Sequence, residues 1–494
     1  MINGKGRFDA CVEDPTLLQC DKNGCSVQDY VPAISVEQGK TYLFRVINAG
    51  GLVSLNLALA NHTMRIMKTD GRFVNPIDVT SLELNLAQRY SVLVKADQAP
   101  ESYWVAAHSE RSGSGYAYLQ YLNSTPPDAN STIPVHDMRG IELDGLLVSK
   151  DVSTHPQADL LDTGVTPDRS SVIVAAQSVY PPLGRDFWTS NNVSLSMYSP
   201  KPLAAVAYEA VNDDMAAPWP DTVIPGTVLV PDMPDAVWNY SLKPSDAEVS
   251  DIHMDHGLAV FQFVLGNVVD MVFQNTVGNR GAASSHSWHL HGHEVYVLAQ
   301  GSGTFAEADK ETFNFNNPLL RDTFSVWDFG WTAVRFKANV SDSLYCLFTA
   351  LLKYSQYSSF QNAGVWPFHC TVAPHVINGM GFNVITSPDL LSTPPPGLMS
   401  CTMTSVNPDD AQVCMSKAEY EEVIAGGDVV EETTEISLLV GDDDPTVVGE
   451  SEEEMGGEQV DTTEEVASTA TTNMGHSCAA LFGVGGFMMF DIFV

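Results

Sequence analysis

Side chains that bind a soft metal ion stand close together in WPFHCTVAPHVINGM, residues 366–380. Cys370 follows His369, and His375 and Met380 come five and ten residues after the cysteine. A thiolate, two imidazoles and a weak thioether are the ligand set of a blue electron-transfer copper site. The segment supplies the thiolate, the thioether and one imidazole, so it predicts such a site if a second histidine joins from elsewhere.

A second segment rich in histidine, HSWHLHGHE at residues 286–294, offers the missing imidazole. His289 and His291 are two residues apart, so they share one face of an extended strand. His286 lies before Trp288 and can face a different direction. We therefore expect His286 to complete the Cys370 site, which leaves His289 and His291 for a second metal site.

Strand geometry also separates Cys370 from its neighbours in sequence. Successive side chains on a strand point to opposite faces, so His369 and Thr371 face away from the site of Cys370. We expect His369 to join His289 and His291 at the second site. One peptide segment then links two metal centres through covalent bonds, which is a short path for electrons.

The alternative for each of these histidines is a structural or exposed role. Four histidines within residues 286–293, together with a His-Cys pair and a downstream His and Met, are hard to obtain by chance. By contrast, we expect His253 and His256 to lie in a solvated loop and His293 to serve packing.

The elements that must position these residues are β-strands. Residues 28–122 and 166–390 alternate apolar and polar positions between Gly, Asn, Asp and Pro breaks, and no long stretch of period 3.6 competes. The sequence therefore predicts an all-β fold of two sandwich domains. We place the first domain at 1–125, a linker rich in Pro, Asp, Ser and Thr at 126–165, and the second at 166–390.

Charge is sparse and strongly one-signed along this chain of 494 residues, with a net charge of −37. Such a chain does not seek nucleic acid or anionic membranes through its net field. Much of the acid lies between Glu419 and Glu465, a stretch with few aromatic residues. We expect residues 391–494 to form a disordered acidic tail with an apolar C-terminus.

Several features favour a secreted or cell-surface glycoprotein with disulfide bonds. Asn-X-Ser/Thr sequons occur at Asn61, Asn123, Asn130, Asn192 and Asn239, and cysteines cluster at Cys11, Cys20, Cys25, Cys401 and Cys414. No signal peptide opens the chain, so we expect the natural N-terminus to be missing. The last residues, CAALFGVGGFMMFDIFV, are either a lipid-anchor attachment signal or a frayed end. No feature specifies an oligomeric state.

The chain resembles the multicopper oxidase family, the group of laccases, ascorbate oxidases and ferroxidases built from Greek-key cupredoxin domains. INGKGRF, GKTYLFRVINAG, NHTMRIMKTDG and QRYSVLV are similar to the family's middle domain. GNVVDMVFQN, HSWHLHGHEVYVLAQGSGTF, NPLLRDTFSV and GWTAVRFKA are similar to its last domain.

This resemblance implies roles for the candidate ligands. His286, Cys370, His375 and Met380 would hold the type 1 copper, which takes electrons singly from a small reducing substrate. His289 would serve a type 2 copper, and His291 and His369 a type 3 pair, where dioxygen is reduced to water. Cys370, His286 and His369 would carry the electrons, which makes them the catalytic candidates.

Three departures from the family pattern stand out. The family's first domain, which supplies half of the cluster's histidines, is absent, and Cys25 would then have lost its partner. Thr371 replaces a type 3 histidine, and a hydroxyl is a poor copper ligand beside imidazole. Residues 340–361 interrupt a segment that the family runs straight through, and they are either a retained intron or a surface insertion.

Three candidate functions result from these observations. The first is an oxidase of the laccase-like kind that acts on a phenol, ascorbate or ferrous iron and on dioxygen, with an incomplete type 2/type 3 cluster in this chain. The second is a non-catalytic protein with a single type 1 copper, for electron transfer or copper binding. The third is a structural cell-surface relative without copper, against which the retained Cys370, His375 and Met380 argue.

Overall fold

The computed structural model describes a subset of the chain, and all of that subset belongs to one compact unit. The described residues are 2–3, 32–109, 113–125, 166–180, 185–196, 203, 206–207, 223–224, 226–234, 254–276, 285–338, 362–390 and 488–493. The cysteine clusters, the inter-domain linker, the interruption at 340–361 and most of the acidic tail lie outside them.

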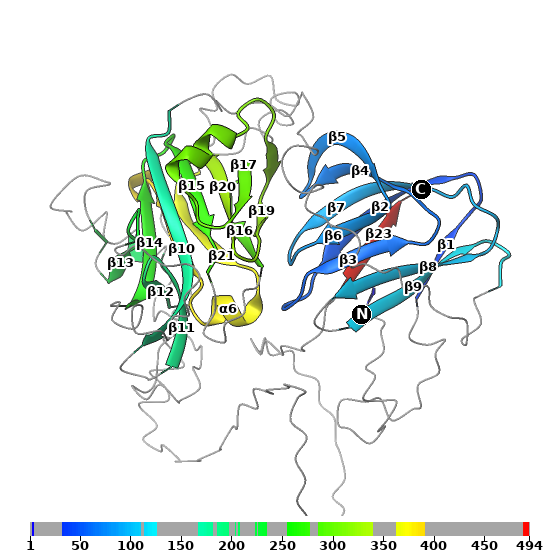
Figure 1. The fold of residues 1–494 in the computed structure, drawn as a ribbon, viewed down its shortest axis with the longest axis horizontal. Coiled ribbons are helices and arrows are strands. Elements are labelled where there is room, and N and C mark those ends of the chain that lie inside the picture. The colour runs from blue at the N-terminus through cyan, green and yellow to red at the C-terminus, as the bar shows by residue number, and fades with distance from the viewer. Residues whose placement is uncertain are drawn as a thin grey trace, which may run out of the picture. The chain divides into compact units, whose positions relative to one another are not determined.

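The first group of strands forms two five-stranded sheets (Figure 1). One sheet has the order β1-β9-β8-β3-β6 and the other β23-β2-β7-β4-β5. The strands are β1 (Ala33–Val36), β2 (Thr41–Asn48), β3 (Leu55–Leu59), β4 (Met64–Thr69), β5 (Arg72–Val79), β6 (Ser81–Leu84), β7 (Arg89–Lys95), β8 (Ser102–Ser109), β9 (Gly113–Tyr121) and β23 (Met488–Phe493).

The alternation expected from the sequence explains these strands. In β2, Tyr42, Phe44 and Val46 are buried while Thr41 and Arg45 are exposed. Burial of each large apolar side chain contributes about 1.5 to 3 kcal/mol, so the alternating faces fix which side of the strand packs inward.

The second group of strands forms one continuous hydrogen-bonded path. Its order is β18-β17-β20-β15-β10-β11-β12-β14-β22-β21-β16-β19, with β13 paired to β14. The strands are β10 (Arg169–Tyr180), β11 (Arg185–Ser190), β12 (Val193–Leu195), β13 (Thr227–Leu229), β14 (Asp255–Phe263), β15 (Val268–Gln274), β16 (His286–Leu290), β17 (Val295–Ser302), β18 (Leu319–Arg321), β19 (Thr323–Val326), β20 (Gly330–Lys337), β21 (Gly364–Cys370) and β22 (Gly381–Thr386). The predicted all-β class is confirmed.

Helical structure among the described residues is limited to short elements. They include η2 (Glu307–Thr312), α6 (Ala373–Ile377) and η3 (Pro388–Leu390), and residues 203 and 206–207 are also helical. None of the helices in the described part of the chain has the length and hydropathy that a membrane crossing requires.

An aromatic core lies beneath the two histidine-bearing strands β16 and β21. The Phe273 ring contacts Trp288 at 4.7 Å, Phe368 at 5.0 Å and Phe324 at 5.2 Å between ring centroids. All four side chains are at most 1% exposed. This rigid packing fixes the backbone from which the candidate ligands project.

Two expectations need correction. Residues 488–493, expected within the disordered tail, form β23 and pair with β2. His256, expected in a loop, is the second residue of strand β14, and its ring lies 5.1 Å from that of Phe187 between centroids. In both cases backbone pairing with a strand distant in sequence determined the outcome.

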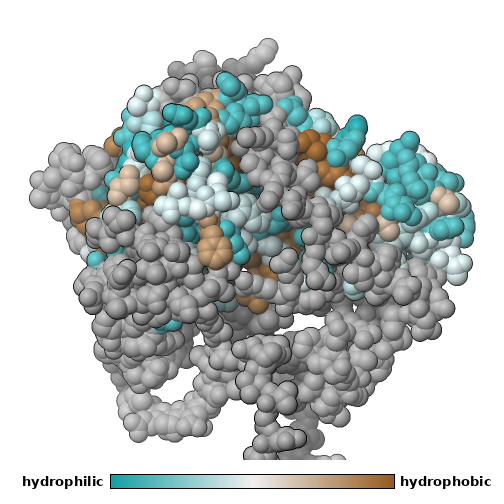
Figure 2. All heavy atoms as spheres, viewed as in Figure 1, coloured by the Kyte–Doolittle hydropathy of each residue, from teal (hydrophilic) through white to brown (hydrophobic). Residues whose placement is uncertain are grey.

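The polar surface is typical of a protein in contact with water. The exposure of each sequon asparagine distinguishes the sequons that suit a glycan from those that do not. On the face drawn in Figure 2, hydrophilic residues are interspersed with smaller groups of hydrophobic ones. Asn61 and Asn123 are exposed in turns, where a glycan can be attached. Asn192 is only 5% exposed, so its sequon does not suit modification of the folded chain.

His62 predicts a pH-dependent stability of the first group of strands. It is 4% exposed, its Nδ1–H donates to the Ala60 carbonyl at 2.7 Å, and its Nε2 accepts from the Tyr121 hydroxyl at 2.9 Å. Burial lowers the pKa of His62 below its ordinary value. As pH falls through the ordinary histidine pKa of about 6.5, the unfolded chain therefore takes up a proton that the folded chain does not, and stability falls.

Urea unfolding of the metal-free protein at pH 8 and pH 5.5 tests this expectation. The free energy of unfolding should be lower at pH 5.5, and the difference should shrink in His62→Gln. An equal pH dependence in the two proteins would contradict the assignment.

Candidate metal centre

Two adjacent strands carry most of the candidate ligands. β16 pairs antiparallel with β21, with Trp288 opposite Cys370 and His289 opposite His369. Residues directly opposite one another share a face of the sheet, and successive residues alternate between faces. Cys370 and His369 therefore project to opposite sides, which divides the candidate ligands into two groups.

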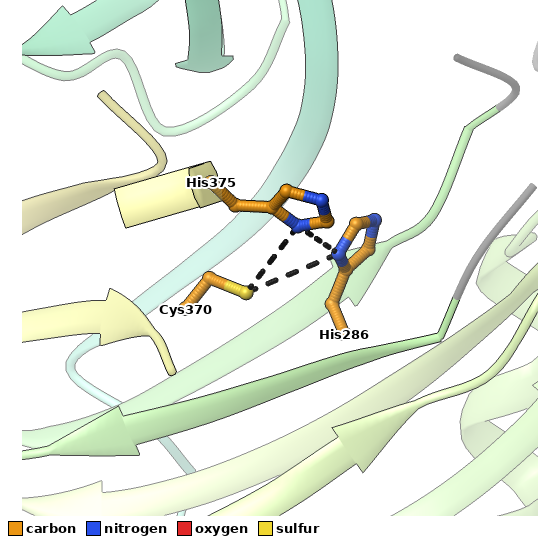
Figure 3. A group of neighbouring side chains, drawn as sticks. All are labelled: His286, Cys370 and His375. Atoms are coloured by element: carbon orange, nitrogen blue, oxygen red, sulfur yellow. Dashed lines mark hydrogen bonds between the residues drawn. The ribbon is translucent and has the colours of Figure 1, made fainter. Parts of the chain in front are cut away.

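The first group consists of His286, Cys370 and His375 (Figure 3). Their Nδ1, Sγ and Nδ1 atoms lie within 4.8 Å of one another. The two Nδ1 atoms are 3.1 Å apart, and Sγ lies 3.9 Å from His286 and 3.8 Å from His375. Zinc, a first-row ion, has metal–nitrogen distances of about 2.0 Å and metal–sulfur distances of about 2.3 Å, and on that scale a trigonal site has donors about 3.5 to 3.7 Å apart. The three donors thus surround a space of the size that one such ion needs.

The loop from Cys370 to Met380 folds back to bring its ends together. The Met380 N–H donates to the His375 carbonyl at 2.9 Å, and the Met380 carbonyl accepts from the Cys370 N–H at 3.1 Å. Helix α6, with Pro374 in its first turn, carries His375. Met380 is fully buried, and these backbone bonds hold its main chain beside that of Cys370.

Trp188 of β11 packs on both histidines of this group. Its ring centroid lies 4.6 Å from that of His375 and 5.1 Å from that of His286, and its side chain is 6% exposed. The backbone N–H of Trp188 donates to the Asn378 carbonyl at 2.7 Å. Gly379 permits this approach, because a Cβ there would come within 2.8 Å of the Trp188 carbonyl and 2.0 Å of Ser194 Oγ. The indole therefore holds both imidazoles in place.

Replacing Trp188 with alanine should weaken metal retention. Loss of this buried ring should cost about 3 to 5 kcal/mol of stability and free both imidazoles to rotate. We expect the copper-loaded variant to lose metal to a chelator at least several-fold faster, and Trp188→Phe to lie in between.

Trp104→Ala provides the matched control, because Trp104 packs on Tyr116 and Tyr118 of the other strand group. It should lower stability without changing the chelation rate. Equal chelation rates in Trp188→Ala and the unaltered protein would contradict the role of the indole.

The chemistry of the donor set fits copper. Burial raises the pKa of the Cys370 thiol to about 12, so without a cation the sulfur stays protonated. A bound cation would displace that proton and stabilise the thiolate, and a soft thiolate with two imidazoles selects copper. The residues of the first group therefore suit copper, the ion that their side-chain types predict.

The second group consists of His289, His291 and His369, on the other side of the sheet. The Nε2 atoms of His291 and His369 are 3.0 Å apart, and the rings of His289 and His291 are 4.7 Å apart between centroids. Burial, and then the neighbouring His289 and His369, lower the pKa of His291 to about 4. At neutral pH His291 is thus uncharged, which is the form that binds a metal ion.

A charged network orients His289. Its Nδ1 lies 3.0 Å from both the Asp322 carbonyl and Thr323 Oγ1, which leaves Nε2 as the remaining ring nitrogen. The Asp322 carboxylate accepts from Arg89 Nη1 at 2.7 Å. Burial alone would raise the pKa of Asp322, but the hydrogen bonds to His289 and Arg89 lower it below the ordinary value. Asp322 therefore stays ionised beside the histidine.

Thr371 is engaged with the backbone and not with this histidine group. Its N–H donates to the Ser287 carbonyl at 2.7 Å. Its hydroxyl lies 3.2 Å from the carbonyls of Leu86 and Ser287. Because a hydroxyl carries one proton, it donates to one of these carbonyls at a time. Thr371 stands where the family pattern has a histidine, and it instead contacts Leu86 of the first strand group.

The structure brings together His286, Cys370 and His375 in one place and His289, His291 and His369 in another. It buries Met380, whose backbone is hydrogen-bonded to Cys370. Sequence reasoning missed Trp188, Asp322 and Thr323. No local signal marks them, because their contacts with the histidines depend on how strands distant in sequence pair. His293 is 5% exposed and lies against Trp366 and Phe336, as expected for packing.

Comparisons with known proteins agree with this architecture. Family models described as multicopper oxidase match residues 1–124 and 227–346. The L-ascorbate oxidase of Cucumis sativus is 29% identical over 440 residues, which cover 82% of this chain and 64% of the relative. Laccase-2 of Oryza sativa subsp. japonica is 26% identical over 393 residues, which cover 75% of this chain and 62% of the relative.

A solved structure shows the same fold. Fet3p, described as a multicopper oxidase that functions in iron import, superposes with a TM-score of 0.51 at 17% identity, covering 73% of this chain and 58% of that chain. This chain spans just under two thirds of the length of the curated relatives that it matches. The two family models and these relatives lead to one conclusion: the chain belongs to the multicopper oxidase family.

Proposed function

We propose that this chain is a copper-dependent oxidoreductase that takes one electron at a time from a small reducing substrate at a type 1 copper site. His286, Cys370 and His375 would hold the copper, and the Met380 thioether would be a fourth, weaker donor. The observation that carries the proposal is the convergence of two imidazole nitrogens and one thiol sulfur within 4.8 Å, with His286 and Cys370 buried and His375 partly buried. Copper bound there would supply one-electron redox chemistry.

The protein's own residues set the conditions for that chemistry. Trp188 and the aromatic core hold the ligands rigid, so little rearrangement is needed when the charge at the site changes. The peptide bond between Cys370 and His369 joins the two ligand groups covalently. His369 therefore provides the exit from the first group toward His289 and His291.

Reduction of dioxygen needs more ligands than the second group offers. Within the described residues this group contains three imidazoles, and Thr371 binds backbone carbonyls. In our proposal the type 2/type 3 cluster of this chain is incomplete, and full oxidase activity requires ligands from outside the described residues. A phenol, ascorbate or ferrous iron is the proposed substrate, in line with the names of the relatives.

The second candidate function is a non-catalytic protein that carries electrons or holds copper at a lone type 1 site. Thr371 favours this candidate, because its hydroxyl contacts backbone carbonyls at the position where the family pattern has an imidazole. Both candidates share the first ligand group, and they differ only in where the electron goes once the copper has been reduced.

Anaerobic mixing of the copper-loaded full chain with ascorbate, hydroquinone or ferrous iron tests the proposal. At least one reductant should bleach the visible absorption of the copper–thiolate bond. Sustained oxygen consumption on exposure to air would then support the oxidase, and its absence the second candidate. If no reductant bleaches the band, the proposed electron entry is wrong.

We also propose that the protein is secreted or displayed at the cell surface. The exposed sequons at Asn61 and Asn123 support this location, because a glycan there meets no packed neighbour. Expression in a eukaryotic host should give a mass shift that a glycosidase removes. The shift should become smaller in Asn61→Gln/Asn123→Gln, in which the sequons at Asn130 and Asn239 remain.

A further inference from the structure

The last strand of the chain closes a sheet edge in the first strand group. β23 pairs antiparallel with β2 over six register positions, from Leu43 opposite Phe493 to Asn48 opposite Met488. In Figure 1 it is the red strand beside β2. The sheet order β23-β2-β7-β4-β5 makes β23 the edge. Without it, β2 would present an unpaired row of N–H and C=O groups, which readily accepts another strand.

The register agrees with the charge pattern of both strands. Asp491 is the only charged residue between Cys478 and Val494, and it stands opposite Arg45, the only charged residue of β2. Arg45 is exposed, whereas its neighbours Phe44 and Val46 are fully buried. Opposite charges on directly opposing residues stabilise an antiparallel pair.

A shift of the β2–β23 register by one residue would remove the match between Asp491 and Arg45. It would place Asp491 opposite Phe44 or Val46, on the side of the sheet that packs inward, where a lone carboxylate is strongly disfavoured. The observed register therefore sets the one charged position of the C-terminal segment opposite the one charged position of β2. A C-terminal segment that needed only to be apolar would not require an acidic residue at position 491.

We propose that the β2 edge is a strand-binding site and that its occupant is the C-terminal segment Met488–Phe493 of the same chain. The main-chain hydrogen bonds give the affinity, and the pairing of Asp491 with Arg45 gives the register. The segment between β22 and β23 is long, but the entropic cost of closing a loop grows only slowly with length.

Hydrogen exchange on the full chain tests the occupancy of the site. Every second amide of Leu43–Asn48 faces β23 and should exchange slowly. Deletion of residues 488–494 should speed exchange of these amides at least tenfold, while amides of β7, an interior strand, stay protected. If the same amides exchange equally fast with and without the segment, the pairing is wrong.

Charge reversal tests the register and does not depend on a truncated chain that folds. Asp491→Arg should speed exchange of the β2 edge amides, and Arg45→Asp/Asp491→Arg should restore protection. Asp78→Arg, at an exposed pair with Arg65 on the far strands, is the control and should leave the β2 edge unchanged. Failure of the double variant to recover would overturn the proposed register.

A disulfide crosslink in Arg45→Cys/Asp491→Cys identifies the occupant. Mass spectrometry on a mixture of isotopically labelled and unlabelled chains should find the bridge within single chains. Bridges between chains would instead assign the site to a second copy. A mature protein from eukaryotic cells that ends before residue 488 and carries a lipid would also overturn the proposal, since the segment would then be a removed anchor signal.

Discussion

Cys370→Ser should abolish the blue absorption of the copper-loaded protein. The hydroxyl of serine is a hard and weakly acidic donor, and it cannot form the copper–thiolate bond from which the strong visible band arises. Cys370 is fully buried, and serine is close to it in size, so the fold should persist. Absorption and circular dichroism spectra of the two proteins at equal copper loading provide the measurement.

Met380→Leu is the matched control for this variant. Leucine fills the same buried volume but removes the thioether, which as a weak donor would tune the reduction potential of a bound copper without forming the visible band. We expect Met380→Leu to remain blue and to show a higher potential. A blue Cys370→Ser protein would show that the band has another origin and would remove the basis of the proposed site.

The second large effect concerns the buried ion pair between Asp70 and Arg321. The Asp70 carboxylate accepts from Arg321 Nε at 2.9 Å, and the two side chains are 0% and 3% exposed. Its other oxygen accepts from the Arg89 N–H at 2.9 Å. Asp70 belongs to the first strand group and Arg321 to the second, so this pair joins the two.

Asp70→Asn keeps the shape of the side chain but leaves the Arg321 charge buried and uncompensated. We expect a loss of about 3 to 5 kcal/mol in the free energy of unfolding, measured in urea. Asp78→Asn, at the exposed pair with Arg65, should change the same quantity little. Equal effects of the two substitutions would contradict the importance of burial for this pair.

The strands of both groups could be predicted because alternation of apolar and polar residues follows directly from strand geometry. The two ligand groups could also be predicted in part. His289 and His291 are two residues apart, and His369 is adjacent to Cys370. Because side chains alternate between the two faces of a strand, these spacings alone predict which face each residue occupies. The sequence also marks Thr371 as a departure, since it stands beside a cysteine where the family pattern has histidine.

The surroundings of the ligands could not be predicted in the same way. Trp188 reaches His286 and His375 only because the β11–β12 segment docks on the loop at Asn378 and Gly379. Asp322 orients His289 from the neighbouring strand segment, and Arg89 reaches it from the first strand group. These contacts join residues far apart in sequence, and no local periodicity encodes them.

The C-terminal strand is another element whose structure could not be predicted from the sequence alone. An apolar run with one acid after a long acidic stretch is consistent with an anchor signal, a frayed end or an edge strand. Composition alone does not separate these interpretations. Only the register against β2, with Asp491 opposite Arg45, distinguishes the strand.

Copper titration of the metal-free full chain, monitored by visible absorption and electron paramagnetic resonance, tests the type 1 site most directly. We expect an intense blue band that saturates at one copper per chain, with copper bound beyond that adding no further intensity. Absence of the band at every copper concentration, in a protein whose circular dichroism spectrum shows it to be folded, would contradict a type 1 site at His286, Cys370 and His375.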